Sequence, residues 1–184
     1  MKIYVETERL ILREILPADI DGMFELDADP AVHHYLGNNP VKSIEQIPAI
    51  IEFIRKQYVD YGIGRWAVID KRTNDFLGWA GLKYITEEQN GHIRYYDLGY
   101  RFIKRYWGKG FATEAAIATL DYGFNTLGLK EIVAIADCQN KGSNNVLRKV
   151  GFTFTNVFEI DGVPHNWYAL AKNPSKHQPC KITS

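Results

Sequence analysis

The sequence has few cysteines, no excess of charge of either sign and no long apolar run. Cys138 and Cys180 are its two cysteines, and their isolated positions exclude a disulfide framework and a cysteine-based zinc site, which favours a reducing cytoplasm. The 22 Lys and Arg residues balance 22 Asp and Glu residues, so the charge does not indicate direct nucleic-acid binding. No run of about 18 apolar residues suggests a membrane span, and the first residues do not resemble a secretion signal. We therefore expect a cytoplasmic protein that binds neither nucleic acid nor a membrane.

The remaining composition is typical of a globular chain. Hydrophobic residues make up 46% and charged residues 24% of the 184 residues, which is too apolar for a disordered protein. This length suits one well-buried core and is short for two. We expect one domain over residues 1–172 and a polar C-terminal tail over residues 173–184.

Hydrophobic periodicity predicts an α/β (α+β) chain with about seven strands. The strands are expected over residues 9–16, 65–69, 76–82, 95–103, 132–136, 152–160 and 165–171, and the helices over residues 18–28, 29–35, 43–61, 112–127 and 143–150. Short polar connections favour an antiparallel meander in the middle of the chain. The long helix before residues 132–136 favours a parallel, buried position for that strand. These features predict a central mixed, mostly antiparallel sheet with one parallel pair, flanked by helices.

Two glycines stand at the junction between a strand and the long helix, in the segment Trp107–Ala115. Glycine lets the backbone come close to a ligand, and the free N–H groups of a helix N-terminus attract a phosphate. A P-loop would need glycine at Ile103 and a dinucleotide fingerprint would need it at Thr113, so neither motif is present. The residues alone leave two interpretations, a phosphate-binding loop and a glycine turn that only starts the helix.

Four separated segments together resemble the GNAT superfamily of acyl-CoA-dependent N-acetyltransferases. Within it they are most similar to the branch of RimJ and RimL, which acetylate the N-termini of ribosomal proteins. The segments are Thr7–Arg13, Asp29–Tyr35, Leu98–Ala115 and Asn140–Phe152. The resemblance implies the GNAT fold, acetyl-CoA as co-substrate and no metal ion.

The superfamily's cofactor loop fits this chain in two registers, which start at Arg105 or at Trp107. The second is preferred, because the RimJ and RimL branch carries Trp-Gly there and because it preserves the family's strand spacing. The resemblance then implies that backbone amides of the loop hold the coenzyme A pyrophosphate, and that the preceding strand pairs with the pantetheine arm. The residues expected to bind the cofactor are Tyr100, Arg101, Phe102, Trp107, Gly108, Lys109, Gly110, Phe111, Ala112, Thr113, Asn140 and Ser143.

The segment after the strand expected over residues 132–136 contains a candidate general acid. The resemblance implies that Asn140 bonds the pantetheine arm, although Asn at a strand end is also a common turn residue. Ser143 is expected to open the next helix as its N-cap, and the resemblance gives it a second role as proton donor to the leaving thiolate. Many superfamily members use instead a Tyr at the position of Leu147.

The general base is less clear, because Ile135 replaces the acidic residue that some superfamily members carry on this strand. Asp97 is the first candidate and Glu159 the second, and each could instead be a solvated strand carboxylate. An α-amino group has a pKa of about 7.7–8.0 against about 10.4 for lysine, so an N-terminal acceptor needs only a weak base. The lack of an obvious base therefore favours α-amines.

Other polar and aromatic residues carry weaker expectations. His33 and His34 have no third ligand at metal spacing, so we expect them at the surface or in the acceptor pocket. Cys138 has no paired histidine, which favours a buried structural thiol. Trp66 and Trp79 could line an acceptor cleft, although aromatic residues on strands more often belong to the core.

The sequence thus predicts an enzyme in which an amine attacks the thioester of acetyl-CoA directly in a ternary complex. The expected acceptor is a protein N-terminus, for example of a ribosomal protein, and the expected state is a monomer or homodimer. Two alternatives stay open: an N-acetyltransferase of small amines such as an aminoglycoside or polyamine, and a non-catalytic acyl-CoA-binding module. Several carboxylates in the acceptor cleft would favour a small amine.

Overall fold

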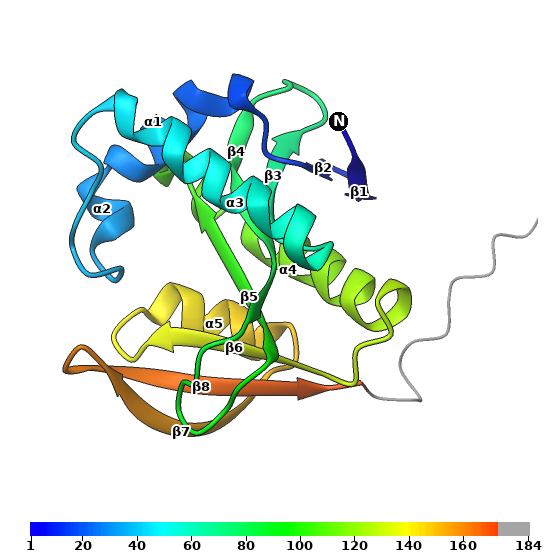
Figure 1. The fold of residues 1–184 in the computed structure, drawn as a ribbon, viewed down its shortest axis with the longest axis vertical. Coiled ribbons are helices and arrows are strands. Elements are labelled where there is room, and N and C mark those ends of the chain that lie inside the picture. The colour runs from blue at the N-terminus through cyan, green and yellow to red at the C-terminus, as the bar shows by residue number, and fades with distance from the viewer. Residues whose placement is uncertain (173–184) are drawn as a thin grey trace, which may run out of the picture.

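An eight-stranded sheet with helices on both faces forms the part of the chain that the computed structural model describes, residues 1–172 (Figure 1). The predicted tail over residues 173–184 lies outside the described residues. The strands are β1 (Ile3–Glu6), β2 (Leu10–Arg13), β3 (Arg65–Asp70), β4 (Phe76–Ile85), β5 (Tyr95–Phe102), β6 (Glu131–Asp137), β7 (Thr153–Ile160) and β8 (Val163–Ala171). The helices are α1 (Ile20–Ala28), α2 (Pro30–His33), α3 (Ile47–Tyr61), α4 (Phe111–Asp121) and α5 (Lys141–Lys149), with a π-helical turn over Tyr122–Thr126 after α4.

The strand order is β1-β2-β3-β4-β5-β6-β8-β7, and every neighbouring pair is antiparallel except β5 and β6. The predicted mixed, mostly antiparallel sheet with one parallel pair is therefore confirmed. The expectation of one strand over residues 9–16 was wrong, because β2 ends at Arg13 and a separate strand, β1, precedes it. Only four residues form β1, and the residues at its two ends are exposed, so it carries no apolar alternation from which it could be predicted.

Two apolar cores lie on opposite faces of the sheet. On one face, which we call the α4 face, α4 and α5 pack through residues such as Phe111 and Leu147 against Leu98 and Phe102 of β5. On the other, the α3 face, residues of α1, α2 and α3 pack over Ala67 and other residues of the N-terminal strands. Side chains alternate along a strand, so the even-numbered residues of β5 face α4 and its odd-numbered residues face α1 and α3.

The parallel pair is short, and this shapes the site. β5 and β6 are partners at one position, Asp97 opposite Val133. Beyond it the two strands diverge, as Figure 1 shows where β5 rises away from β6. The N–H of Ile103 donates to the carbonyl of Leu77 in the β4 segment, and hydrogen-bonding direction alternates along a strand. The backbone groups of the even-numbered residue Phe102 therefore point into the gap between β5 and β6.

Candidate active site

The loop before α4 leaves a row of backbone amides free. Gly108 and Gly110 have φ angles of +73° and +81°, in the left-handed region that glycine adopts readily. The first helical hydrogen bond runs from the N–H of Glu114 to the carbonyl of Gly110, at 3.0 Å. Within residues 1–172 no acceptor is found for the amides from Gly108 to Thr113. Free amides at the positive end of an 11-residue helix suit a phosphate, so the loop fits the pyrophosphate of coenzyme A.

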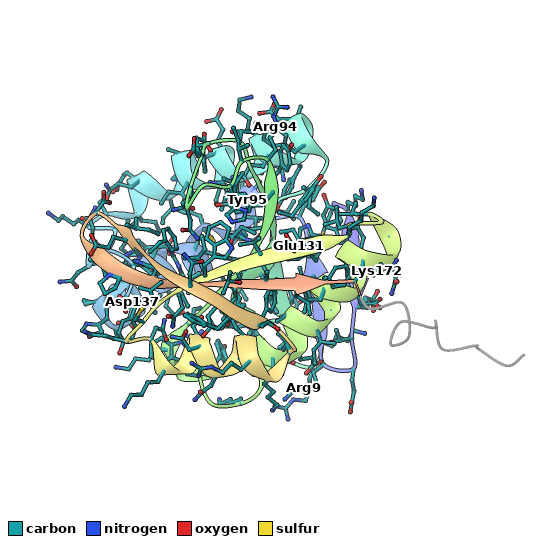
Figure 2. The ribbon with its side chains drawn as sticks, turned by 90° about the horizontal axis from the view of Figure 1, so that it is seen from below. Arg9, Arg94, Tyr95, Glu131, Asp137 and Lys172 are labelled. Carbon is teal, nitrogen blue, oxygen red and sulfur yellow. The ribbon has the colours of Figure 1, made fainter. Side chains whose placement is uncertain are left out.

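A clamp from the connection between β1 and β2 holds this loop. The Arg9 guanidinium donates to the Lys109 carbonyl at 3.0 Å and to the Glu114 carboxylate at 2.6 Å, and Arg9 is labelled beside the helices in Figure 2. The Thr7 hydroxyl also donates to Glu114, at 2.6 Å. Burial works in the opposite direction, but the hydrogen bonds from Thr7 and Arg9 hold the pKa of Glu114 below its usual value. The sequence reasoning missed this clamp, although Thr7 and Arg9 belong to one of the segments that carry the family resemblance.

The side chain of Trp107 connects the same loop to the end of β5. Its indole N–H donates to the carbonyl of Phe102 at 2.7 Å, while about half of the side chain stays exposed. Arg105, the alternative start of the cofactor motif, instead pairs with the Glu25 carboxylate on α1. Trp107 thus contacts β5 and Arg105 contacts α1, and the choice between the two registers stays a prediction.

The N-terminus of α5 lies on the other side of the gap between β5 and β6, and its cap differs from the one expected. Asn140 is the N-cap of α5, and its side-chain oxygen accepts the N–H of Ser143 at 3.0 Å. The prediction that Ser143 caps this helix was wrong, because the helix begins at Lys141 and Ser143 is its third residue, within the first turn. The buried Asn144, which the sequence reasoning missed, donates to the carbonyls of Asp137 and Asn140 at 2.8 and 2.7 Å. It anchors α5 to the end of β6, where Figure 2 labels Asp137.

Tyr100 reaches from β5 to α5. Its hydroxyl lies 3.1 Å from both the hydroxyl and the carbonyl oxygen of Ser143. Burial raises the pKa of Tyr100, so its phenol stays protonated at neutral pH and can donate to Ser143. The sequence assigned Tyr100 only a backbone role, and its side chain is a further polar group beside the candidate acid.

Asp97 lies at the closed end of the gap, on the α3 face. Its carboxylate accepts a hydrogen bond of 2.5 Å from Arg65, and the two side chains are 16% and 11% exposed. The alternative of a solvated carboxylate was therefore wrong. Burial raises the pKa of Asp97, although the charge and hydrogen bond of Arg65 oppose that shift.

Two glycines make this ion pair possible. Arg65 on β3 is the partner of Gly81 on β4, and Gly81 is the partner of Gly99 on β5. The Arg65 side chain crosses this row and donates to the Gly81 carbonyl at 2.5 Å and to the Asp97 carbonyl at 2.7 Å. A Cβ atom on Gly99 would lie 2.5 Å from an Arg65 nitrogen, so a larger residue at this position would displace the guanidinium from its present place.

The remaining candidates lie elsewhere. Glu159 is exposed on β7, opposite Pro164, close to the turn into β8. Of the two positions expected for the histidines, His34 is at the surface, whereas His33 is buried, so for His33 the surface position is excluded. Trp66 belongs to the core of the α4 face. Cys138 is partly buried, and its thiol donates to Asn166 at 3.2 Å.

Residues 1–172 lack two kinds of feature. No cluster of three or more His, Cys, Asp or Glu side chains in this range could hold a metal ion. None of the helices described here is both long enough and apolar enough to cross a membrane.

Comparisons with known proteins agree with this geometry. The Acetyltransferase (GNAT) domain family matches residues 9–153. The N-acetyltransferase YoaA of Bacillus subtilis is 31% identical over 91% of this chain and 96% of its own length. The spermidine N(1)-acetyltransferase of Escherichia coli is 28% identical over 77% of this chain and 72% of its own length.

A solved structure shows the same fold. RimL, a ribosomal L7/L12 α-N-protein acetyltransferase in complex with coenzyme A, has a TM-score of 0.77 to this chain at 18% identity. The match covers 92% of this chain and 98% of RimL. With a family match over most of its length and an eight-stranded sheet of the same fold, this chain belongs to the GNAT acetyltransferase family and is an N-acetyltransferase.

Proposed function

We propose that this enzyme transfers the acetyl group of acetyl-CoA to the α-amine of a protein or peptide N-terminus, as members of the RimJ and RimL branch do. The observation that carries the acceptor class is the charge of the α3 face beside the gap. Asp97 is paired with Arg65, and Asp27 is paired with Arg101. A polyamine carries several positive charges and would meet guanidinium groups here instead of free carboxylates. An N-terminus brings one amine and suits a neutral surface.

The amides from Gly108 to Thr113 would hold the pyrophosphate, and the gap-facing backbone of Tyr100 and Phe102 would pair with the pantetheine arm. A carbon–nitrogen bond forms as the neutral amine attacks the thioester carbonyl, and the carbon–sulfur bond then breaks. The amine gives up one proton and the departing thiolate takes one, so an acid is useful on the sulfur side. Ser143, backed by the Tyr100 hydroxyl, would be this acid.

Asp97 is the proposed acceptor of the amine proton. Arg65 holds one of its carboxylate oxygens, and no hydrogen bond to the other is found within residues 1–172. Its raised pKa makes it a better base than an ordinary aspartate. Glu159 has no comparable partner in the described residues and stays the second candidate. An α-amine is already partly neutral near pH 8, so a weak base is enough to accept its proton.

The test measures turnover of acetyl-CoA with a panel of N-terminal peptides, aminoglycosides and polyamines. The release of free thiol reports the rate. We expect peptides to raise thiol release far above background and the other amines to do so weakly. Preference for spermidine or an aminoglycoside would replace the proposed acceptor. Tight coenzyme A binding with no turnover on any amine would support the binding-module alternative.

Three further assignments belong to the same proposal. We place the enzyme in the cytoplasm as a monomer or homodimer, with residues 1–172 as one domain. Free Cys138 agrees with a reducing compartment. The continuous sheet from β1 to β7 agrees with a single folding unit.

A further inference from the structure

One lysine on the α3 face has no carboxylate partner. Lys83 on β4 is the direct partner of Asp97 on β5, and the Cβ atoms of directly opposite residues lie about 5 Å apart on the same face. Asp97 is nevertheless paired with Arg65. Within residues 1–172, Lys83 forms neither an ion pair nor a side-chain hydrogen bond. The fold thus places an ammonium group beside a carboxylate and leaves it unpaired.

The ammonium group of Lys83 is accessible from outside. Its Nζ lies 5.6 Å from the ring centre of Phe53 on α3, a cation–π contact, and Phe53 is 60% exposed. Lys83 itself is partly buried, but its Nζ is not one of the buried atoms that lack a partner. The aromatic ring therefore holds the ammonium in place while a ligand on the α3 face can still contact it.

The other charged groups near Lys83 do not balance its charge. Glu87, in the loop after β4, is exposed and forms no ion pair with Lys83. Hydrogen bonds from residues 86 and 87 lower the pKa of Glu87, and the charge of Lys83 adds a smaller effect in the same direction. On α3, Lys56 and Asp60 pair with each other. Within residues 1–172, Lys83 therefore keeps a charge that a ligand can balance.

Lys83 lies next to the proposed base. The acceptor amine has to come within hydrogen-bond distance of Asp97 to lose its proton there. Neighbouring strands are about 4.8 Å apart, so the Lys83 side chain starts one strand away from the attacking nitrogen. In an N-terminal aspartate or glutamate, one or two methylene groups separate the α-carbon from the carboxylate. Such a side chain, directed from Asp97 toward β4, brings its carboxylate to Lys83.

We propose that Lys83 binds a carboxylate of the acceptor, so that the enzyme prefers N-termini whose first residue is aspartate or glutamate. This inference rests on the proposed function and names the class of the acceptor's first side chain. An ammonium donates a charge-assisted hydrogen bond to a carboxylate, which is stronger than a hydrogen bond between neutral groups. A polyamine carries only positive groups, which Lys83 repels.

The experiment compares two short peptides that are identical except for their first residue, aspartate in one and asparagine in the other. The two side chains have nearly the same shape and differ in charge. Lys83→Met removes the ammonium and keeps the length of the side chain. Lys2→Met is the matched control, because the Lys2 Nζ lies 4.6 Å from the ring centre of Tyr4 but belongs to the outer strand β1 of the sheet. For each enzyme, kcat/KM is measured with saturating acetyl-CoA, and urea unfolding reports stability.

We expect the ratio of kcat/KM for the aspartate peptide over the asparagine peptide to fall about tenfold in Lys83→Met, the effect of one charge-assisted hydrogen bond. Lys2→Met should keep the wild-type ratio. Loss of the Lys83 charge also changes the pKa of Asp97, but this acts on both peptides alike and cancels in the ratio. The same ratio in Lys83→Met as in the wild type would overturn the inference.

A second measurement needs no variant and holds even where Lys83→Met does not fold. Salt screens an attraction between charges at a partly exposed site. Raising the ionic strength should therefore lower the aspartate-to-asparagine ratio of the wild-type enzyme. A ratio that does not change between low and high salt would also overturn the inference.

Failure of the proposed function gives a different result. Leucine and leucine amide are added as acceptors, because they differ only in the α-carboxylate. If the wild type acetylates leucine, Lys83→Met does not, and neither acetylates a peptide, the carboxylate site stands and the acceptor is a free amino acid. If both enzymes acetylate the peptides with one and the same ratio, the proposed function stands and this inference falls. Acetylation of spermidine alone would contradict both.

Discussion

Gly110 offers a direct test of the phosphate-binding loop. With φ at +81°, alanine at this position must adopt the left-handed conformation, which costs about 1–2 kcal/mol. A Cβ atom there meets only an Arg9 nitrogen, at 3.4 Å, so steric conflict within the protein adds little. The new methyl group would stand on the N-cap residue of α4, next to the free amides where the pyrophosphate is expected.

Gly62 is the matched control. It caps the C-terminus of α3 with φ at +69°, and a Cβ atom there would have nothing within 4 Å. Gly62→Ala and Gly110→Ala should therefore lower the free energy of unfolding by similar amounts, about 1–2 kcal/mol. They differ in one respect, since only Gly110 lies at the proposed phosphate site.

Calorimetry measures the affinity of each variant for coenzyme A, and urea unfolding measures its stability. The two effects are thereby separated. Losing one or two charge-assisted hydrogen bonds to phosphate, about 1.5–3 kcal/mol each, raises Kd roughly 10- to 100-fold or more in Gly110→Ala. Gly62→Ala should bind as the wild type does. The branched Gly110→Val should bind more weakly still. Equal affinity of Gly110→Ala and Gly62→Ala for coenzyme A would refute the assignment of the loop.

Three further predictions concern the acid, the clamp and the base. Ser143→Ala should lower kcat about 10²-fold, and Tyr100→Phe should lower it in the wild type but not further in Ser143→Ala; wild-type turnover of Ser143→Ala with saturating acetyl-CoA would exclude the acid role. Glu114→Gln should cost about 1–2 kcal/mol at pH 7. Because the folded pKa lies below the usual 4.5, that stability is present above pH 4.5 and is lost as the pH falls through the folded pKa. In urea unfolding, the difference in stability between Glu114→Gln and the wild type should therefore shrink as the pH is lowered stepwise from 7. Gly99→Ala should push the Arg65 guanidinium away from Asp97 and so raise the pKa of Asp97 further. The acidic limb of the pH profile of kcat should then move to higher pH. An unmoved limb would argue against Asp97 as the base.

Local patterns predicted where the glycine loop and the long helix meet. Gly108 and Gly110 at the start of an apolar-striped helix left two interpretations, a phosphate-binding loop and a simple glycine turn, and the loop has the free amides that the first one requires. The parallel position of β6 followed from one crossover helix and an unbroken apolar strand. These features depend on neighbouring residues, whose spacing can be read directly.

The acceptor side could not be predicted in the same way. The pairs Arg65 with Asp97 and Arg101 with Asp27 join residues 32 and 74 positions apart, and no local periodicity encodes such distances. The error at Ser143 has a local cause, because both Asn and Ser are good N-caps and they stand three positions apart. Only the backbone geometry shows that Asn140 fills this role.

The most direct test of the central claim uses one peptide that carries both a free α-amine and a lysine side chain. The enzyme is incubated with acetyl-CoA and this peptide, and fragmentation mass spectrometry locates the acetyl group. The account predicts one acetyl group on the α-amine, with one free thiol released for each peptide modified. Acetylation of the lysine side chain, or of spermidine but not of the peptide, would contradict it.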